Sequence, residues 1–146
     1  MAAIRPTLLE DLGLSRAVQA FARDQEVESG IPIAVETRVF AEPNRVTGVT
    51  VFRAAQEAIM NARKHASAEH IRVMLESRDG TVVLEVADDG RGRGEEPDGL
   101  GLSYMRDRVA SLGGSVTIDS VPGQGTTVRA QIPVEDSDGT APDPGR

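Results

Sequence analysis

A short link between two alternating segments places the strongest constraint on what this chain can fold into. Apolar and polar side chains alternate at about 69–77 and again at 81–87, and the two segments are joined at Asp79-Gly80. An Asp-Gly link of this kind is typical of a tight β-hairpin, because both residues tolerate the positive φ angles that the turn requires. The sequence therefore predicts an antiparallel pair of strands in the middle of the chain.

Helices and further strands are expected on both sides of this hairpin. Apolar residues recur at helical spacing or alternate, and Gly or Pro ends most of the segments. The expected order is a helix at 7–29, a strand at 33–39, a helix at 46–65, the first hairpin, a helix at 102–112 and a second hairpin at 115–133. This order lacks the repeated βαβ units of a Rossmann fold. It predicts an α/β two-layer sandwich, in which helices cover one face of a mixed, mostly antiparallel sheet.

Composition and charge exclude several functions. The chain has 146 residues, a formal net charge of -7, no Cys and few aromatic residues. An acidic chain gains little affinity from nucleic-acid phosphates, so we expect no nucleic-acid partner. The absence of Cys fits a reducing compartment, and no apolar segment approaches the roughly 20 residues that span a bilayer. We expect a cytoplasmic chain without direct membrane contact, ending in a disordered acidic tail at 135–146.

Two polar residues are expected on the apolar faces of strands. Asp88 has the same parity as the apolar residues at 82, 84 and 86, and Thr126 has the same parity as those at 128, 130 and 132. A carboxylate on such a face is costly unless it accepts hydrogen bonds. Adenine would satisfy both side chains, directly or through a water. Taken alone, Asp88 is explained at least as well as a turn residue that caps the glycine-rich loop.

One side of the helix at 46–65 carries side chains suited to phosphate chemistry. Glu57, Asn61 and Lys64 share this side. An Asn oxygen is a suitable ligand for Mg²⁺, and a Glu can orient or deprotonate a nucleophile. Lys64 and His65 can donate hydrogen bonds to phosphates. The alternative is a solvated polar face, with His65 in an ordinary position at a helix end.

A glycine-rich segment follows the central hairpin. Five glycines fall within a dozen residues, at Gly90, Gly92, Gly94, Gly99 and Gly101. One interpretation is a lid over phosphates, with the backbone amides of Gly99, Leu100, Gly101 and Leu102 forming an anion site at a helix N-terminus. The other is a flexible surface loop. The pattern GxxxxGK[ST] is absent, which excludes a Walker-type P-loop.

Together these segments resemble the GHKL ATPase superfamily, which includes histidine kinases, gyrase, MutL and a heat-shock chaperone. Four motifs in the family's order lie between residues 46 and 133: residues 56–66 resemble the Asn box, 88–92 the DxGxG box, 99–102 the second glycine box and 123–127 the Gly-Thr box. The resemblance implies a Bergerat ATP-binding fold over residues 31–134, with ATP and Mg²⁺ as ligands.

The Asn-box helix and the helix that reads GLSYMRDRVASLGG are similar to those of NarX/DesK-like sensor kinases. Such kinases phosphorylate a histidine on a separate dimerising helix pair and then a response regulator, so both are implied partners. The resemblance implies that Asp88 binds the adenine amine and that Thr126 assists through a water. It also implies that Asn61 holds Mg²⁺ and that Glu57 is the catalytic base.

The same resemblance assigns phosphate contacts to Lys64 and His65. Between Gly92 and Gly99 the chain departs from what a phosphate lid would favour, because residues 95–98 carry three carboxylates beside the expected polyphosphate site. Whether this lid contacts phosphate stays open.

Residues 1–30 look like the end of a dimerisation or linker helix, and no His precedes Asn61. We therefore expect a monomeric catalytic fragment that binds Mg-ATP but does not phosphorylate itself, whether or not the full-length protein is attached to a membrane. The alternative is an anti-sigma-factor-like serine kinase, or a nucleotide-binding regulatory module without histidine phosphotransfer.

Overall fold

The computed structural model describes residues 6–39, 41–65, 68–92 and 99–134. Its elements follow in the order α1 (Pro6–Leu12), α2 (Leu14–Ser29), β1 (Ile33–Arg38), α3 (Arg45–His65), β2 (Ile71–Arg78), β3 (Thr81–Asp88), α4 (Leu100–Ser111), β4 (Ser115–Val121) and β5 (Gly125–Pro133). The segment 135–146, for which we expect disorder, lies outside the described residues.

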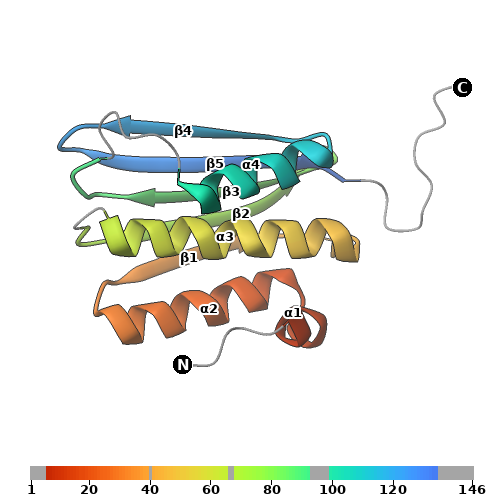
Figure 1. Cartoon of the computed structure of the whole chain (residues 1–146). Coiled ribbons are helices and arrows are strands. Elements are labelled where there is room, and N and C mark those ends of the chain that lie inside the picture. Colours follow the sequence, from red (N-terminus) through yellow and green to blue (C-terminus); the bar gives the residue numbers. More distant parts are fainter. Residues whose placement is uncertain (1–5, 40, 66–67, 93–98, 135–146) are drawn as a thin grey trace, which may run out of the picture.

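The five strands form one mixed sheet in the order β1-β2-β3-β5-β4. β1 runs parallel to β2, and all the other neighbours are antiparallel. Figure 1 shows α2, α3 and α4 lying across the same face of this sheet. The predicted two-layer α/β sandwich with a mostly antiparallel sheet is therefore confirmed.

The hydrophobic core lies between the sheet and the helices. Leu75 and Leu84 are paired across β2 and β3, and both are buried in the same hydrophobic core as Ile59 of α3. The rings of Phe21 and Phe52 join α2 to α3 in an edge-to-face contact, with centroids 6.3 Å apart. Burying one such large apolar side chain stabilises the fold by about 1.5–3 kcal/mol. The core therefore fixes α2 and α3 on the sheet.

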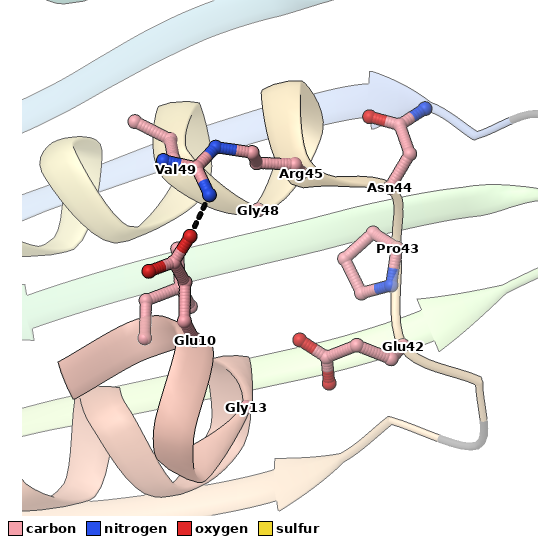
Figure 2. A pocket seen from close by; sticks show the side chains of 9 residues that line it. Glu10, Gly13, Glu42, Pro43, Asn44, Arg45, Gly48 and Val49 are labelled. Atoms are coloured by element: carbon pink, nitrogen blue, oxygen red, sulfur yellow. Dashed lines mark ion pairs between the residues drawn. The ribbon is translucent and has the colours of Figure 1, made fainter. Parts of the chain in front are cut away.

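The helical character expected at 7–29 is confirmed, but the segment forms two helices and the prediction of one continuous helix was wrong. Gly13 separates them with a φ of 82°, a conformation that residues with side chains rarely adopt. The carboxylate of Glu42 accepts the N–H of Leu14 at 2.8 Å and so caps the start of α2 from a distant segment. Figure 2 shows this carboxylate beside Gly13. Apolar periodicity continues through residues 12–14, so the sequence does not reveal the break.

The N-terminus of α3 is capped locally. The Oδ1 atom of Asn44 accepts the N–H of Thr47 at 2.9 Å, as expected for an N-cap residue. Figure 2 shows a pocket beside this cap, between α1 and the start of α3, with an ion pair between Glu10 and Arg45. The pocket lies at the opposite end of α3 from residues 57–64.

Candidate nucleotide-binding site

The predicted site residues gather at one end of the molecule. The C-terminal ends of α3 and β3 lie there, together with the N-terminal ends of α4 and β5 (Figure 1, left). Segments from 57 to 126 in the sequence therefore meet at one edge of the sandwich. The functional interpretation of the four motifs requires this convergence.

A row of paired residues crosses the sheet at this end. Its members are register partners on successive strands: Ile33, Ile71, Asp88, Thr126 and Ser120. Register partners project to the same face of a sheet, and the burial of Ile33 and Ile71 identifies this face as the one covered by helices. The row is apolar on β1 and β2 and polar on β3, β5 and β4. The predicted common face of Asp88 and Thr126 is confirmed.

The carboxylate of Asp88 is half-buried and held by backbone groups. Its Oδ1 atom accepts the N–H of Gly90 at 2.9 Å. Burial raises the pKa of Asp88 above its usual 3.8; hydrogen bonds from the backbone N–H groups of Gly90 and Thr126 oppose this shift, and the charge of Asp89 adds to it. A partly desolvated carboxylate that is fixed in this way is a strong acceptor for an exocyclic amine.

The absence of a side chain at Gly125 allows β5 to approach the backbone of Asp88 closely. It has a φ of 111°, and a Cβ atom built there would lie 2.0 Å from the backbone oxygen of Asp88. No side chain fits in that space. The glycine of the Gly-Thr motif thus allows Thr126 to sit directly beside Asp88.

The side chain of Glu57 lies against the start of α4. A Cβ atom built at Gly101 would be 2.2 Å from its Oε2 atom, so this space belongs to the carboxylate. Asn61 follows one turn later and is partly exposed, and Lys64 is exposed near the end of the helix. His65 is the last residue of α3, and its side chain lies outside the described part of the structure.

The described ends of the glycine-rich segment are fixed by neighbouring strands. Gly90 is buried, and Gly92 has a φ of 83° with its Cα so close to β4 that an added Cβ would lie 2.8 Å from the backbone oxygen of Val121. Residues 93–98, which include the acidic lid positions, lie outside the described residues.

The N-terminus of α4 has the features of an anion site. Gly99 is its N-cap residue and has no side chain with which to cap the first backbone N–H groups. The helix begins at Leu100, two residues earlier than expected, so the amides of residues 100–102 form its first turn. Leu102 is buried in the core and Leu100 is exposed, so only their backbone amides suit a phosphate.

The sequence interpretation missed two residues beside Asp88. Asp89 points away from the row, and its Oδ1 atom accepts the N–H groups of Glu69 and His70 at 2.8 and 2.9 Å. Its Oδ2 atom lies 2.9 Å from Nδ1 of His70, and the hydrogen bonds from His70 lower the pKa of Asp89 to about 2. Asp89 therefore ties the segment between α3 and β2 to the turn after Asp88. This is why β2 begins at Ile71, two residues later than expected.

Ser120 is the other missed residue. Its Oγ atom lies 3.0 Å from Oγ1 of Thr126. A signal was present in the sequence, because Ser120 has the same parity as Val116 and Ile118 on their strand. Strand parity therefore groups it with these two residues, and its register with Thr126 places it on the face that carries Asp88.

The fold and this polar row define a nucleotide-binding ATPase domain of the two-layer α/β type. The family model described as "Histidine kinase-, DNA gyrase B-, and HSP90-like ATPase" matches residues 47–136. The chain belongs to this ATPase family, which confirms the resemblance that its four motifs indicate. ATP is accordingly the ligand of the family's site.

Individual relatives narrow the similarity. The chain is 36% identical over 139 residues to the oxygen sensor histidine kinase NreB of Staphylococcus carnosus, an alignment covering 91% of the chain and 40% of the relative. It is 36% identical over 137 residues to the signal transduction histidine-protein kinase/phosphatase UhpB of Salmonella typhimurium, covering 89% of the chain and 26% of the relative. The chain thus spans less than half the length of these relatives.

Solved structures agree with the fold. The histidine kinase domain of the blue-light activated histidine kinase from Erythrobacter litoralis matches with a TM-score of 0.69 and 26% identity, covering 83% of this chain and 61% of that one. The catalytic domain of the histidine kinase ThkA matches with a TM-score of 0.64 and 21% identity, covering 83% of this chain and 91% of that one, and supports the fold alone.

Among the described helices, none has the length and hydrophobicity to cross a bilayer.

Proposed function

We propose that this chain is the Mg-ATP-binding catalytic domain of a two-component sensor histidine kinase. It would donate the γ-phosphate of ATP to a histidine on a dimerisation domain outside this chain, for relay to a response regulator. The observation that carries the nucleotide site is the pairing of Asp88 with Thr126 on the helix-covered face of the sheet. The names of the relatives favour histidine over serine as the acceptor.

In this proposal the purine lies at the polar end of the row. Asp88 accepts a hydrogen bond from the exocyclic amine, and Thr126 completes the recognition directly or through a water. The apolar neighbour Ile71 is a register partner of Asp88 and keeps this end of the site partly dry. Low water content strengthens the hydrogen bonds that select the base.

The phosphates lie between α3 and α4 in this proposal. The amides of residues 99–102 and the side chains of Lys64 and His65 bind the polyphosphate, as a helix N-terminus and basic side chains do elsewhere. Gly90 and Gly92 form the start of the glycine-rich lid, called here the foot of the lid, and in this proposal they enclose the polyphosphate.

Asn61 is the residue that would hold Mg²⁺. A single amide oxygen on a partly exposed helix face fits this ion, which takes few protein ligands and keeps phosphate oxygens and waters. Bound Mg²⁺ would neutralise charge on the phosphates. Glu57, one turn earlier and fixed against Gly101, orients the attacking imidazole or accepts its proton.

We propose that residues 1–30 form the end of a dimerisation or linker helix, that residues 31–134 form the catalytic domain, and that residues 135–146 are an acidic tail. The fragment is proposed to be monomeric and cytoplasmic, with its partners supplied by the rest of the kinase and by a response regulator.

Phosphotransfer tests the function. The chain is incubated with radiolabelled ATP, with and without a fragment that carries the dimerising helix pair of a related kinase. We expect acid-labile, base-stable phosphate on that fragment and none on the chain alone. Labelling of a serine on an anti-anti-sigma protein would support the serine-kinase alternative, and nucleotide binding without transfer to either acceptor would support a regulatory module.

A further inference from the structure

The polar row at the nucleotide end of the sheet has a third member, on β4. Ser120 is paired with Thr126 on one side of β5, as Asp88 is on the other. We propose that Ser120 is a positioning residue that fixes the direction of the Thr126 hydroxyl and thereby sharpens the preference of the site for adenine over guanine. This inference rests on the proposed function, because it assumes that the base binds beside Asp88 and Thr126.

The contact between the two hydroxyls is partly buried. Their oxygens are 3.0 Å apart, and the side chain of Thr126 is buried. The foot of the lid covers Ser120 from the other side: a Cβ atom built at Gly92 would lie 3.1 Å from its Oγ atom. The burial of Thr126 limits the access of water to this hydrogen bond, which favours its persistence in the folded protein.

The direction of this hydrogen bond determines whether the Thr126 hydroxyl donates a hydrogen bond to a bound purine or accepts one from it. A hydroxyl has one proton, so when Ser120 donates to Thr126, the proton of Thr126 points to the ligand. The site then presents an acceptor on Asp88 and a donor on Thr126. Adenine has an amine beside an accepting ring nitrogen and matches this pattern, whereas guanine has a carbonyl beside an N–H and opposes it. A water that bridges Thr126 and the base can transmit the same pattern of donor and acceptor.

Nucleotide titration tests this role without any phosphotransfer. Dissociation constants for ATP and GTP are measured by isothermal titration with the whole chain, its Ser120→Ala variant and a Ser115→Ala control. Ser115 is on the same strand but exposed, with the opposite parity. We expect Ser120→Ala to weaken ATP binding by about 3- to 10-fold, the effect of one net hydrogen bond, without a comparable change for GTP. Ser115→Ala is expected to leave both constants unchanged.

An unchanged ratio of the two constants would overturn the inference, whether both stay the same or both weaken equally, because a merely structural role acts on every nucleotide. If Ser120→Ala unfolds, Ser120→Cys keeps the size of the side chain with a much weaker donor and permits the same comparison. Asp88→Asn, measured in the same titration, distinguishes a failure of the role of Ser120 from a failure of the adenine site itself. If Asp88→Asn weakens ATP binding and the Ser120 variant keeps the ratio, only the role of Ser120 fails. If Asp88→Asn has no effect, the adenine site itself fails.

Discussion

The carboxylate of Glu57 occupies the space that a side chain at Gly101 would need, with 2.2 Å between Oε2 and the position of the missing Cβ. This relationship joins the Asn-box helix to the second glycine motif. Any side chain larger than hydrogen at position 101 would therefore displace the proposed catalytic carboxylate of Glu57.

Gly101→Ala is therefore expected to displace Glu57 while leaving the protein folded. The clash involves the end of a flexible side chain, and Ala is favoured over Gly in a helix by about 1 kcal/mol, so the free energy of unfolding should change by no more than that amount. We expect phosphotransfer to a partner fragment to fall by about 10- to 100-fold. Gly48→Ala, in α3 with only ordinary contacts around it, is the control and should retain full activity. Full activity of Gly101→Ala would show that the position of Glu57 is not critical.

Asp88→Asn is expected to weaken ATP binding by about 1.5–3 kcal/mol, the scale of a hydrogen bond to a charged group. The reason is that an amide oxygen is a weaker acceptor for the adenine amine than a half-buried carboxylate. Isothermal titration measures the change. Asp119→Asn, an exposed position on β4, controls for the loss of one negative charge. Equal affinities for the wild type and Asp88→Asn would remove Asp88 from the site.

Asp89 gives the stability of the fold a specific dependence on acid. Its pKa is lowered in the folded state, from 3.8 to about 2, so its interactions with His70 stabilise the fold above the unfolded pKa. That stabilisation is lost as the pH falls from 3.8 towards 2. We expect the melting temperature of Asp89→Asn to depend less on pH in this range than that of the wild type. Parallel curves of melting temperature against pH would contradict this account.

Gly125→Ala is expected to destabilise the fold by more than about 2 kcal/mol, because its Cβ would overlap the backbone of Asp88 at a positive φ. Gly123 is a matched control. It also has a positive φ, of 81°, but no atom lies within 4 Å of an added Cβ. Gly123→Ala should therefore show the cost of backbone strain alone, about 1 kcal/mol. Chemical denaturation measures both variants, and similar losses would mean that the overlap with Asp88 is relieved.

Much of the sheet could be predicted because alternation is a local property. Parity alone put Asp88 and Thr126 on the apolar faces of their strands, and the register of β3 with β5 shows that they share one face. The same parity argument applies to Ser120, which alternates with Val116 and Ile118 on its strand. Local turn chemistry likewise located the central hairpin at Asp79-Gly80.

The features that could not be predicted depend on partners far away in sequence. Glu42 caps α2 across 28 residues, so the break at Gly13 has no local signature. Asp89 holds residues 69 and 70 across about 20 residues and delays the start of β2. The contact between Glu57 and Gly101 joins two helices whose sequences carry no mark of their packing. In each case a single long-range contact determines a boundary or an orientation.

The insertion of β5 between β3 and β4 has a consequence for biosynthesis. Asp88 leaves the ribosome well before Thr126, and β5, which brings Thr126 to it, is the last of the described strands to be made. A nascent chain that stops short of β5 lacks the hydroxyl of Thr126, and it also lacks the strand that pairs with β3 beside the carboxylate of Asp88. Nucleotide capture therefore requires the synthesis of β5 and reports a complete sheet, so a fluorescent ATP analogue would serve as a sensor of the folding of this sheet.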